Sequence, residues 1–310
     1  MNNSKNVSSG FRMSLRNTGR NIIKWRVSYL FILPFMLIFL TFTVYSVIQA
    51  VYYSFTQFNM LEAPIWIGLD NYKNLLFNDS VFLTAVKNTL LFAAITGPVS
   101  YFMCLFLAWF VSELPPKPRA FLTLLFYAPT LANIFMVWKL IFSGDENGIL
   151  NAWLLRIGVT TSSIQWLTNP KYMATVVIIV ILWSSLGASF LSFIAGFQNV
   201  DRSLYEAGAV DGVKNRWQEL WYITLPVMRP QLMFGAVMSI TSSFGIGDQI
   251  SELCGFPSAN YAVHTIMNHL SDYGSTRFQM GYACAIATIL FLLMVGCNKV
   301  IQNMLAKVGE

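Results

Sequence analysis

The familiar catalytic side-chain patterns are missing from this sequence. It contains no G-x-x-x-x-G-K-[ST] phosphate loop, no H-E-x-x-H zinc motif and no pair of carboxylates inside an apolar run. His264 and His269 are five residues apart, off any common helix face, and have no third ligand nearby in the sequence. We therefore expect two exterior loop residues, no catalytic residues and no metal site.

A second group of polar residues suits the binding of a polar solute. Hydroxyl and amide side chains beside an aromatic face can hydrogen-bond to a solute and stack on it within an apolar pore. The candidates lie in two apolar runs: Trp183, Ser185, Ser242, Ser243, Asp248 and Gln249. The alternative is that small hydroxyl residues only let helices pack closely. For Asp248, near the outer end of its run, a solvated helix terminus is an equally good interpretation, although a charge at the membrane centre would imply function.

A polar insert, Glu206 to Pro226, interrupts the apolar sequence. Ser203 and Glu206 have the S-x-x-E form of a capping box, which predicts the start of a short helix that Gly212 ends. Asn215 can cap a second helix, and Pro226 breaks its pattern. The apolar residues of this second helix recur at helical spacing and form one stripe: Trp217, Leu220, Trp221 and Leu225.

The charges of this insert favour a protein partner over a lipid surface. Four acidic and four basic residues lie between Asn199 and Arg229 and cancel one another. The alternative is that the two short helices merely cover the ends of a helix bundle.

Composition places these residues in a polytopic membrane protein. Of 310 residues, 55% are hydrophobic and 11% charged, and the mean hydropathy is +0.56. The net charge of +6 is dispersed between apolar runs, so nucleic-acid binding is not expected. The four cysteines show no metal-ligand spacing, and only Cys254 leaves the question of a disulfide open.

Six apolar runs predict an all-α membrane protein with six transmembrane helices. They are Tyr29–Tyr53, Asn88–Val111, Ala120–Trp138, Tyr172–Phe197, Gln231–Gly247 and Phe278–Asn298. The first run is too long for a signal-peptide core. The predicted organisation is therefore an N-terminal tail (1–28), one transmembrane domain (29–301) with the insert at 199–229, and a C-terminal tail (302–310).

The basic residues predict the orientation of these helices. With both termini in the cytoplasm, 14 Lys and Arg residues lie on the cytoplasmic side and 6 outside. This distribution places the insert in the cytoplasm.

The insert resembles the EAA motif of binding-protein-dependent ABC importer permeases. The matching residues are Glu206, Ala207, Gly208, Asp211, Gly212, Ile223, Thr224, Leu225 and Pro226. In that family the motif forms a coupling helix that sits in a groove of the cytosolic ATPase. Gly208 replaces the usual second alanine, which should loosen the helix by up to about 1 kcal/mol. One extra residue also separates Gly212 from Ile223, so we expect a longer turn at 213–215.

Further segments resemble the carbohydrate branch of this family, the relatives of maltose and multiple-sugar permeases. They are Trp66–Leu76, Lys87–Ala93, Gly148–Gly158 and Gly281–Phe291. Trp183 matches an aromatic residue of the sugar site of maltose-type permeases. The resemblance implies a sugar importer in the bacterial cytoplasmic membrane. Its expected partners are a second homologous permease, two cytosolic ATPase subunits, an extracytoplasmic sugar-binding protein and membrane lipid.

The resemblance implies no cofactor on this chain, with ATP and Mg on the partner ATPase. Two alternatives stay open: a permease for another solute, such as glycerol phosphate or polyamines, and a membrane-embedded enzyme. Basic residues inside the spans would favour glycerol phosphate, and intramembrane acid–base residues would favour the enzyme. The sequence shows neither.

Overall fold

The computed structural model describes residues 25–131 and 135–305, and most of these residues are helical. The chain divides after Tyr53 into two units by its internal contacts. The predicted tail falls largely on residues outside the described part, as do residues 306–310.

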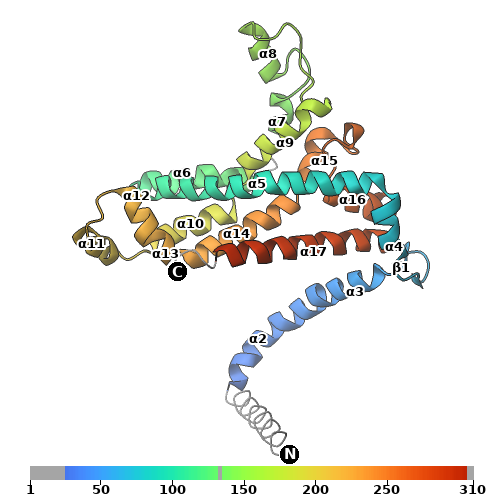
Figure 1. Ribbon diagram of the computed structural model, residues 1–310, viewed down its shortest axis with the longest axis horizontal. Coiled ribbons are helices and arrows are strands. Elements are labelled where there is room, and N and C mark those ends of the chain that lie inside the picture. Colours follow the sequence, from blue (N-terminus) through green and yellow to red (C-terminus); the bar gives the residue numbers. More distant parts are fainter. Residues whose placement is uncertain (1–24, 132–134, 306–310) are drawn as a thin grey trace, which may run out of the picture. The chain divides into compact units, whose positions relative to one another are not determined.

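The N-terminal unit is one long apolar helix. It consists of α2 (Arg26–Phe39), a π-helical turn (Leu40–Val44) and α3 (Tyr45–Tyr53). An 18-residue stretch of this helix, drawn in blue in Figure 1, has a mean hydropathy of 2.3, and none of the 28 residues is buried. An apolar helix of this length, with its backbone hydrogen bonds satisfied internally, suits the interior of a bilayer. It corresponds to the predicted first span and begins three residues earlier.

The second unit begins with a small hairpin and a long central helix. β1 (Thr56–Gln57) pairs antiparallel with β2 (Ile65–Trp66), and α4 (Asp70–Lys73) continues as a π-helical turn to Asn78. The 33-residue helix α5 (Ser80–Ser112) follows, and the Asp79 carboxylate caps it by accepting a hydrogen bond of 2.9 Å from the Phe82 N–H. Pro98 lies inside α5 without ending it.

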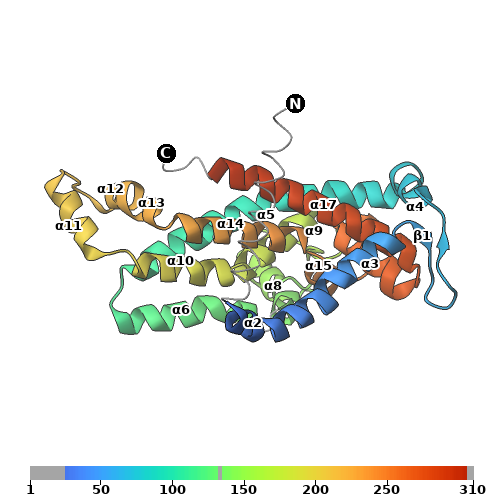
Figure 2. The same ribbon diagram turned by 90° about the horizontal axis from the view of Figure 1, so that it is seen from below.

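The remaining helices are arranged around α5. In chain order they are α6 (Pro116–Leu131), α7 (Phe135–Ile141), α8 (Ile149–Arg156), α9 (Pro170–Ser184), α10 (Ala188–Gln198), α11 (Arg202–Val210), α12 (Arg216–Glu219), α13 (Leu225–Val227), α14 (Arg229–Phe244), α15 (Asp248–Cys254), α16 (Ile266–Ser271) and α17 (Met280–Leu305). Figure 2 shows α6, α10, α14 and α17 in that order across the bundle, and neighbouring members of this series are in contact.

Three buried clusters hold this unit together, and α5 contributes to each. Cys104 and Ala108 pack with residues of α10, α13 and α14, and Phe92 packs with α9 and α15. Phe82 and Ala85 pack with α14, α16 and α17. Because close van der Waals packing holds helices together within a bilayer, the helix that joins all three clusters is the central support of the fold.

The membrane-length helices agree with most of the predicted spans. Four helical stretches are long and apolar enough to cross a membrane, and there are up to six if two bent pairs each count as one span. In the bent pair Arg216–Val227 and Arg229–Phe244, the two parts lie at 83° to each other. The predicted break at Pro226 is therefore wrong: α13 continues through this proline, and the bend comes at Met228.

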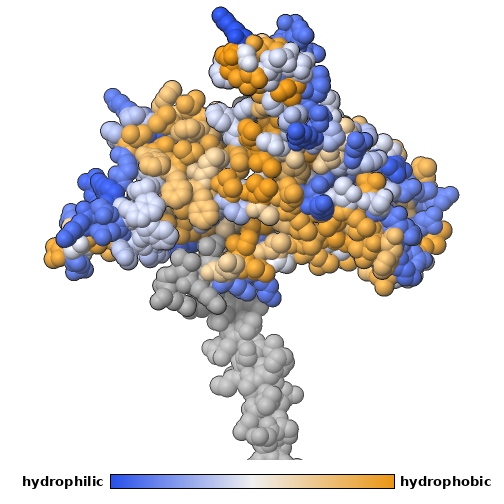
Figure 3. Space-filling view, turned by 45° about the horizontal axis from the view of Figure 1, so that its top comes forward, coloured by the Kyte–Doolittle hydropathy of each residue, from blue (hydrophilic) through white to orange (hydrophobic). Residues whose placement is uncertain are grey.

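The surface of the helix bundle is divided into apolar and polar regions. Hydrophobic residues form a broad band across the middle of the helix bundle, and hydrophilic residues gather at its two ends, around α11 and around the hairpin (Figure 3). All four cysteines are free.

Candidate functional site

The polar insert folds as two short helices, as predicted, but the first begins differently. The Asp201 side chain, not Ser203, caps α11 by accepting a hydrogen bond of 3.1 Å from the Ser203 N–H. The predicted capping box is therefore wrong, because Asp201 is an equally good cap and lies two residues earlier. The predicted end is confirmed: α11 stops at Val210, and Gly212 takes a left-handed φ of +94°.

Asn215 caps the second helix, as predicted. Its side chain accepts a hydrogen bond of 2.9 Å from the Gln218 N–H. After α12 the backbone widens into a π-helical turn, Leu220–Thr224, before α13. This turn shifts the phase of the predicted apolar stripe, so Leu220 and Leu225 are buried whereas Trp217 and Trp221 remain about half exposed.

The candidate coupling residues lie on two sides of the insert. Glu206, Ala207, Asp211, Gly212 and Pro226 are exposed, whereas Gly208 and Leu225 are buried. On the exposed side, α11 also presents the apolar residue Val210, which is 89% exposed.

The close packing at Gly208 explains its departure from the motif. A Cβ atom at this position would lie 2.6 Å from Cδ1 of Ile223, in the π-helical turn. The hydroxyls of Tyr205 and Thr224 form a hydrogen bond of 2.9 Å between the same two segments. Glycine therefore lets α11 rest directly on the turn.

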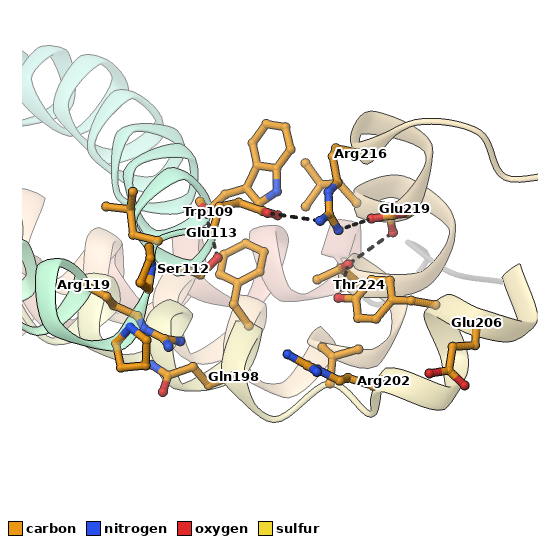
Figure 4. A pocket seen from close by; sticks show the side chains of 17 residues that line it. Trp109, Ser112, Glu113, Arg119, Gln198, Arg202, Glu206, Arg216, Glu219 and Thr224 are labelled. Atoms are coloured by element: carbon orange, nitrogen blue, oxygen red, sulfur yellow. Dashed lines mark hydrogen bonds and ion pairs between the residues drawn. The ribbon is translucent and has the colours of Figure 1, made fainter. Parts of the chain in front are cut away.

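A cavity of about 750 Å³ lies between the insert and the turn joining α5 to α6 (Figure 4). The Arg216 guanidinium lies at its rim, 2.8 Å from the Glu219 carboxylate and 3.6 Å from that of Glu113 at the end of α5. These carboxylates raise the pKa of Arg216, the Glu219 hydrogen bond contributing most. Glu206 lies on α11, apart from this ion-pair group (Figure 4).

A second, smaller cavity of about 210 Å³ lies inside the bundle and brings together four of the six candidate solute-binding residues. Ser185, Ser242, Ser243 and Gln249 line it. Trp183 and Asp248 are not among its lining residues: Trp183 is 51% exposed and packs edge-on against Trp138, and Asp248 is an exposed residue at the start of α15. Sequence reasoning missed four further hydroxyl groups of the lining, those of Thr96, Ser100, Thr130 and Ser184.

Two helix breaks border this smaller cavity. α9 ends at Ser184 and α10 begins at Ala188, and α14 ends at Phe244 and α15 begins at Asp248. Residues of both breaks, Ser185 and Ile246, line the cavity. Interrupted helices at the middle of a membrane protein are typical of solute sites, because they expose polar backbone where a helix would hide it.

Most hydroxyl groups around the smaller cavity donate a hydrogen bond to a backbone carbonyl three or four residues earlier in the chain, and Ser189 donates to the Gly235 carbonyl of α14 at 3.2 Å. Ser185 donates to the Leu182 carbonyl at 2.7 Å, Ser242 to the Met238 carbonyl at 3.0 Å and Ser243 to the Ser239 carbonyl at 2.6 Å. Thr96, Ser100 and Ser184 do the same. A hydroxyl group has one donor and two acceptor positions, so these side chains keep acceptors free for the cavity. Ser243 also serves packing, since a Cβ at Gly97 of α5 would lie 3.4 Å from its Oγ.

Gln249 has the complementary chemistry. Its Oε1 accepts a hydrogen bond of 3.2 Å from the Gly247 N–H, which leaves its amide hydrogens as donors. No charged residue is among the lining residues of this cavity in the described part of the chain. The lining therefore suits a neutral solute rich in hydroxyl groups.

The two histidines are buried, which corrects the expectation of exterior loop residues. His264 and His269 are each 2% exposed. His269 Nε2 lies 3.0 Å from Asp79 Oδ2, and His269 Nδ1 lies 3.3 Å from His264 Nε2. With Asp79 ionised, His269 donates to it from Nε2 and accepts the Nε2–H of His264 at Nδ1.

Burial controls the titration of these groups, which lie outside the membrane-length helices. It lowers the pKa of His264 to about 4 and also lowers the pKa of His269, even though Asp79 opposes the shift at His269. Burial opposes ionisation of Asp79 too, but the Phe82 N–H, His269 and Tyr282 outweigh it and lower the pKa of this carboxyl. In the described residues, no group of three or more His, Cys, Asp or Glu side chains could hold a metal ion.

Comparisons with known proteins agree with this architecture. Residues 105–305 match the family described as "Binding-protein-dependent transport system inner membrane component". A probable ABC transporter permease protein, YesP of Bacillus subtilis (strain 168), is 33% identical over 86% of both chains. The arabinooligosaccharides transport system permease protein AraP of the same organism is 30% identical, over 86% of this chain and 84% of its own.

A solved structure shows the same fold. It is a crystal structure of a bacterial ABC transporter involved in the import of the acidic polysaccharide alginate, and one of its chains matches with a TM-score of 0.76 and 22% identity. The match covers 95% of this chain and all of the other. The chain therefore belongs to the family of binding-protein-dependent transport system inner membrane components, and it is a multi-pass transport subunit of an ABC importer rather than an enzyme.

Proposed function

We propose that this chain is one of two permease subunits of an importer for neutral oligosaccharides. The observation that carries the proposal is the small cavity, whose hydroxyl side chains present acceptors and whose Gln249 presents donors. A sugar offers both donors and acceptors on every ring, so such a lining can bind it without a charged group. Relatives named as permeases for arabinooligosaccharides and for lactose support a sugar as the solute.

The alternative solutes fit this cavity less well. Glycerol phosphate would need a cation, and a polyamine would need carboxylates, because a buried charge without a partner is costly. Neither kind of residue lines the cavity in the described part of the chain. The family match removes the membrane-embedded enzyme from consideration.

The size of the cavity supports a second permease subunit. Small-molecule sites usually enclose about 300–1,000 Å³, whereas this cavity has about 210 Å³. A homologous subunit facing it would complete the solute path. A binding protein would deliver the sugar, and two ATPase subunits would supply ATP and Mg, with no cofactor on this chain. A structure similar to this chain comes from a transporter in complex with an oligosaccharide-bound periplasmic protein, which supports such an assembly.

We further propose that α11 docks into the ATPase subunit. The exposed residues Glu206, Ala207, Asp211 and Gly212, together with Val210, would form the contact. Their charges and exposure support a protein partner. Gly208, Leu225 and Pro226 would hold the docking helix against the membrane part.

Two measurements test these proposals separately. Uptake of arabino-, galacto- and gluco-oligosaccharides, with a uronic-acid oligosaccharide and glycerol phosphate as charged competitors, should show import of a neutral sugar only. Preferred import of a charged solute would contradict the assignment. For docking, Glu206→Ala combined with Gly212→Ala should abolish both ATPase copurification and uptake, whereas Glu62→Ala, an exposed change in the hairpin loop, should alter neither. Retention of both activities by the double variant would show that α11 is not the docking element.

A further inference from the structure

The second half of the insert is attached to α5 by an aromatic contact. The Trp217 ring, on α12, stacks on Phe106 with 6.3 Å between ring centroids and 9° between planes. It also lies 5.7 Å from the Trp109 ring at an angle of 57°. Phe106 and Trp109 are three residues apart on α5, so their rings form one face of that helix. The Trp217 ring thus packs α12 against the last turns of α5.

Two neighbouring contacts add to this packing of the insert against α5. Leu220 belongs to the same buried cluster as Ala108 and Val111 of α5. Arg216 reaches Glu113 at 3.6 Å, but this pair is largely exposed and contributes little to stability. The apolar contacts of the tryptophan and the leucine therefore contribute more to the attachment than the ion pair does.

The docking helix rests on this attached segment. α11 contacts the turn at Leu220–Thr224 through the Tyr205–Thr224 hydrogen bond and the close approach of Gly208 to Ile223. The cavity of about 750 Å³ lies between the insert and the turn joining α5 to α6 (Figure 4). The cavity cannot transmit a displacement from the insert to the end of α5. A movement of α11 would therefore reach α5 through the π-helical turn and the contact of Trp217 with Phe106 and Trp109.

α5 in turn reaches the small cavity. Thr96 and Ser100 of α5 line it, and Gly97 lies against Ser243 on its opposite wall. All three buried clusters include α5. Trp109 and Ser100 lie on the same continuous helix, so a displacement of α5 as a unit would move both ends of this route together.

We propose that Trp217 is a positioning residue that transmits movement of the docking helix α11 to α5 and so to the wall of the solute cavity. This inference rests on the proposed function, and it adds a specific route: coupling enters the membrane part through α5 as well as through the helices that flank the insert. Trp217 does not line the small cavity, and it lies on α12, outside the proposed docking helix α11. Its loss should therefore uncouple the transporter without dissociating it.

The test uses the complete transporter in proteoliposomes with its binding protein. The probe is the oligosaccharide that the wild-type complex imports fastest in the panel above, and the readout is the number of ATP molecules hydrolysed per sugar imported. For Trp217→Ala we expect normal copurification of the ATPase, continued hydrolysis, and a ratio raised about tenfold, the usual size of a coupling effect. Trp217→Phe keeps a ring against Phe106 and should restore most of the coupling. Tyr222→Ala, an exposed change in the same segment, should have the wild-type ratio.

The possible outcomes separate this inference from the proposed function. A wild-type ratio for Trp217→Ala overturns the inference, and so does loss of the ATPase, which would make Trp217 a docking residue. Uptake and hydrolysis that fall in parallel, at an unchanged ratio, also overturn it. If Trp217→Ala does not accumulate, Trp217→Leu, which keeps apolar volume but no ring, serves for the same measurement. Failure of the wild-type complex to import any neutral oligosaccharide would instead refute the proposed function.

Discussion

Asp79, His269 and His264 form a line of buried hydrogen bonds that joins the start of α5 to α16. Tyr282 of α17 also donates to Asp79 Oδ2, at 3.0 Å, so the carboxylate connects three helices. The neighbouring charged groups are Asp272 and Arg277, which pair with each other at the same end of the bundle. At neutral pH both imidazoles are uncharged and Asp79 carries the charge of the group.

Acidification should destabilise the protein through these histidines. Their folded pKa values lie below the unfolded value of about 6.5, so below that pH the unfolded chain binds more protons and stability falls as the pH falls. For His264, with a pKa of about 4, the loss between pH 6.5 and pH 5 is about 2 kcal/mol. His264→Gln keeps an N–H donor near the Nε2 position but cannot titrate. Thermal midpoints of the purified variant should therefore fall less between pH 7 and pH 5 than those of the wild type.

The titration of Asp79 does not contribute to this measurement. Its lowered pKa keeps it ionised throughout that range, so its own contribution is lost only at lower pH. An unchanged pH dependence in His264→Gln would mean that His264 does not supply the acid sensitivity.

At the scale of elements, one buried side chain makes five hydrogen bonds within the segment between α7 and α9. Asn151 of α8 is fully buried, and its amide donates to the carbonyls of Ser143, Asp145 and Ile164 at 3.0–3.2 Å. Its oxygen accepts from the Ile164 N–H and from Trp166 Nε1. Asn151 thus replaces the regular backbone hydrogen bonds that this loop segment lacks.

Removal of this side chain should loosen the segment locally. Asn151→Ala leaves several buried polar groups without partners, each at a cost of about 1–3 kcal/mol. We expect faster amide hydrogen exchange over 143–166 and unchanged exchange in α5. Asn74→Ala, which removes an exposed amide that bonds only one neighbouring side chain, is the control and should leave both regions unchanged. Equal protection of 143–166 in the Asn151 variant and the wild type would show that other contacts hold the segment.

Sequence patterns predicted the elements better than the contacts between them. The apolar runs, Gly212 and the Asn215 cap could be identified because their signals lie within a few residues of one another. The start of α11 and the bend at Met228 could not, because two caps competed at Asp201 and Ser203 and a π-helical turn added a residue after Glu219. The histidine pair was missed because its partner, Asp79, lies 190 residues away in the chain. Only part of the lining of the small cavity was predicted for the same reason, because Thr96 and Ser100 belong to a helix that is distant in the sequence.

For the whole molecule, the distribution of basic residues predicts both termini and the insert in the cytoplasm. Cysteine labelling in intact cells tests this orientation. A Val159→Cys variant, at a residue 67% exposed in the segment after α8, should react with a membrane-impermeant maleimide. Lys214→Cys in the insert should react only after the cells are permeabilised, and the wild type gives the background of the four native cysteines. The reverse pattern would invert the proposed topology.

The lengths of the helices have a further consequence for the surrounding lipid. At about 1.5 Å per residue, the 33 residues of α5 span about 50 Å, whereas the 16 residues of α14 span about 24 Å, less than the roughly 30 Å of hydrocarbon in a typical bilayer. The short helix α14 packs against α5, α10 and α17. A long helix can accommodate a change in bilayer thickness by changing its tilt, whereas α14 is too short to do so and relies on these neighbouring helices to match the bilayer.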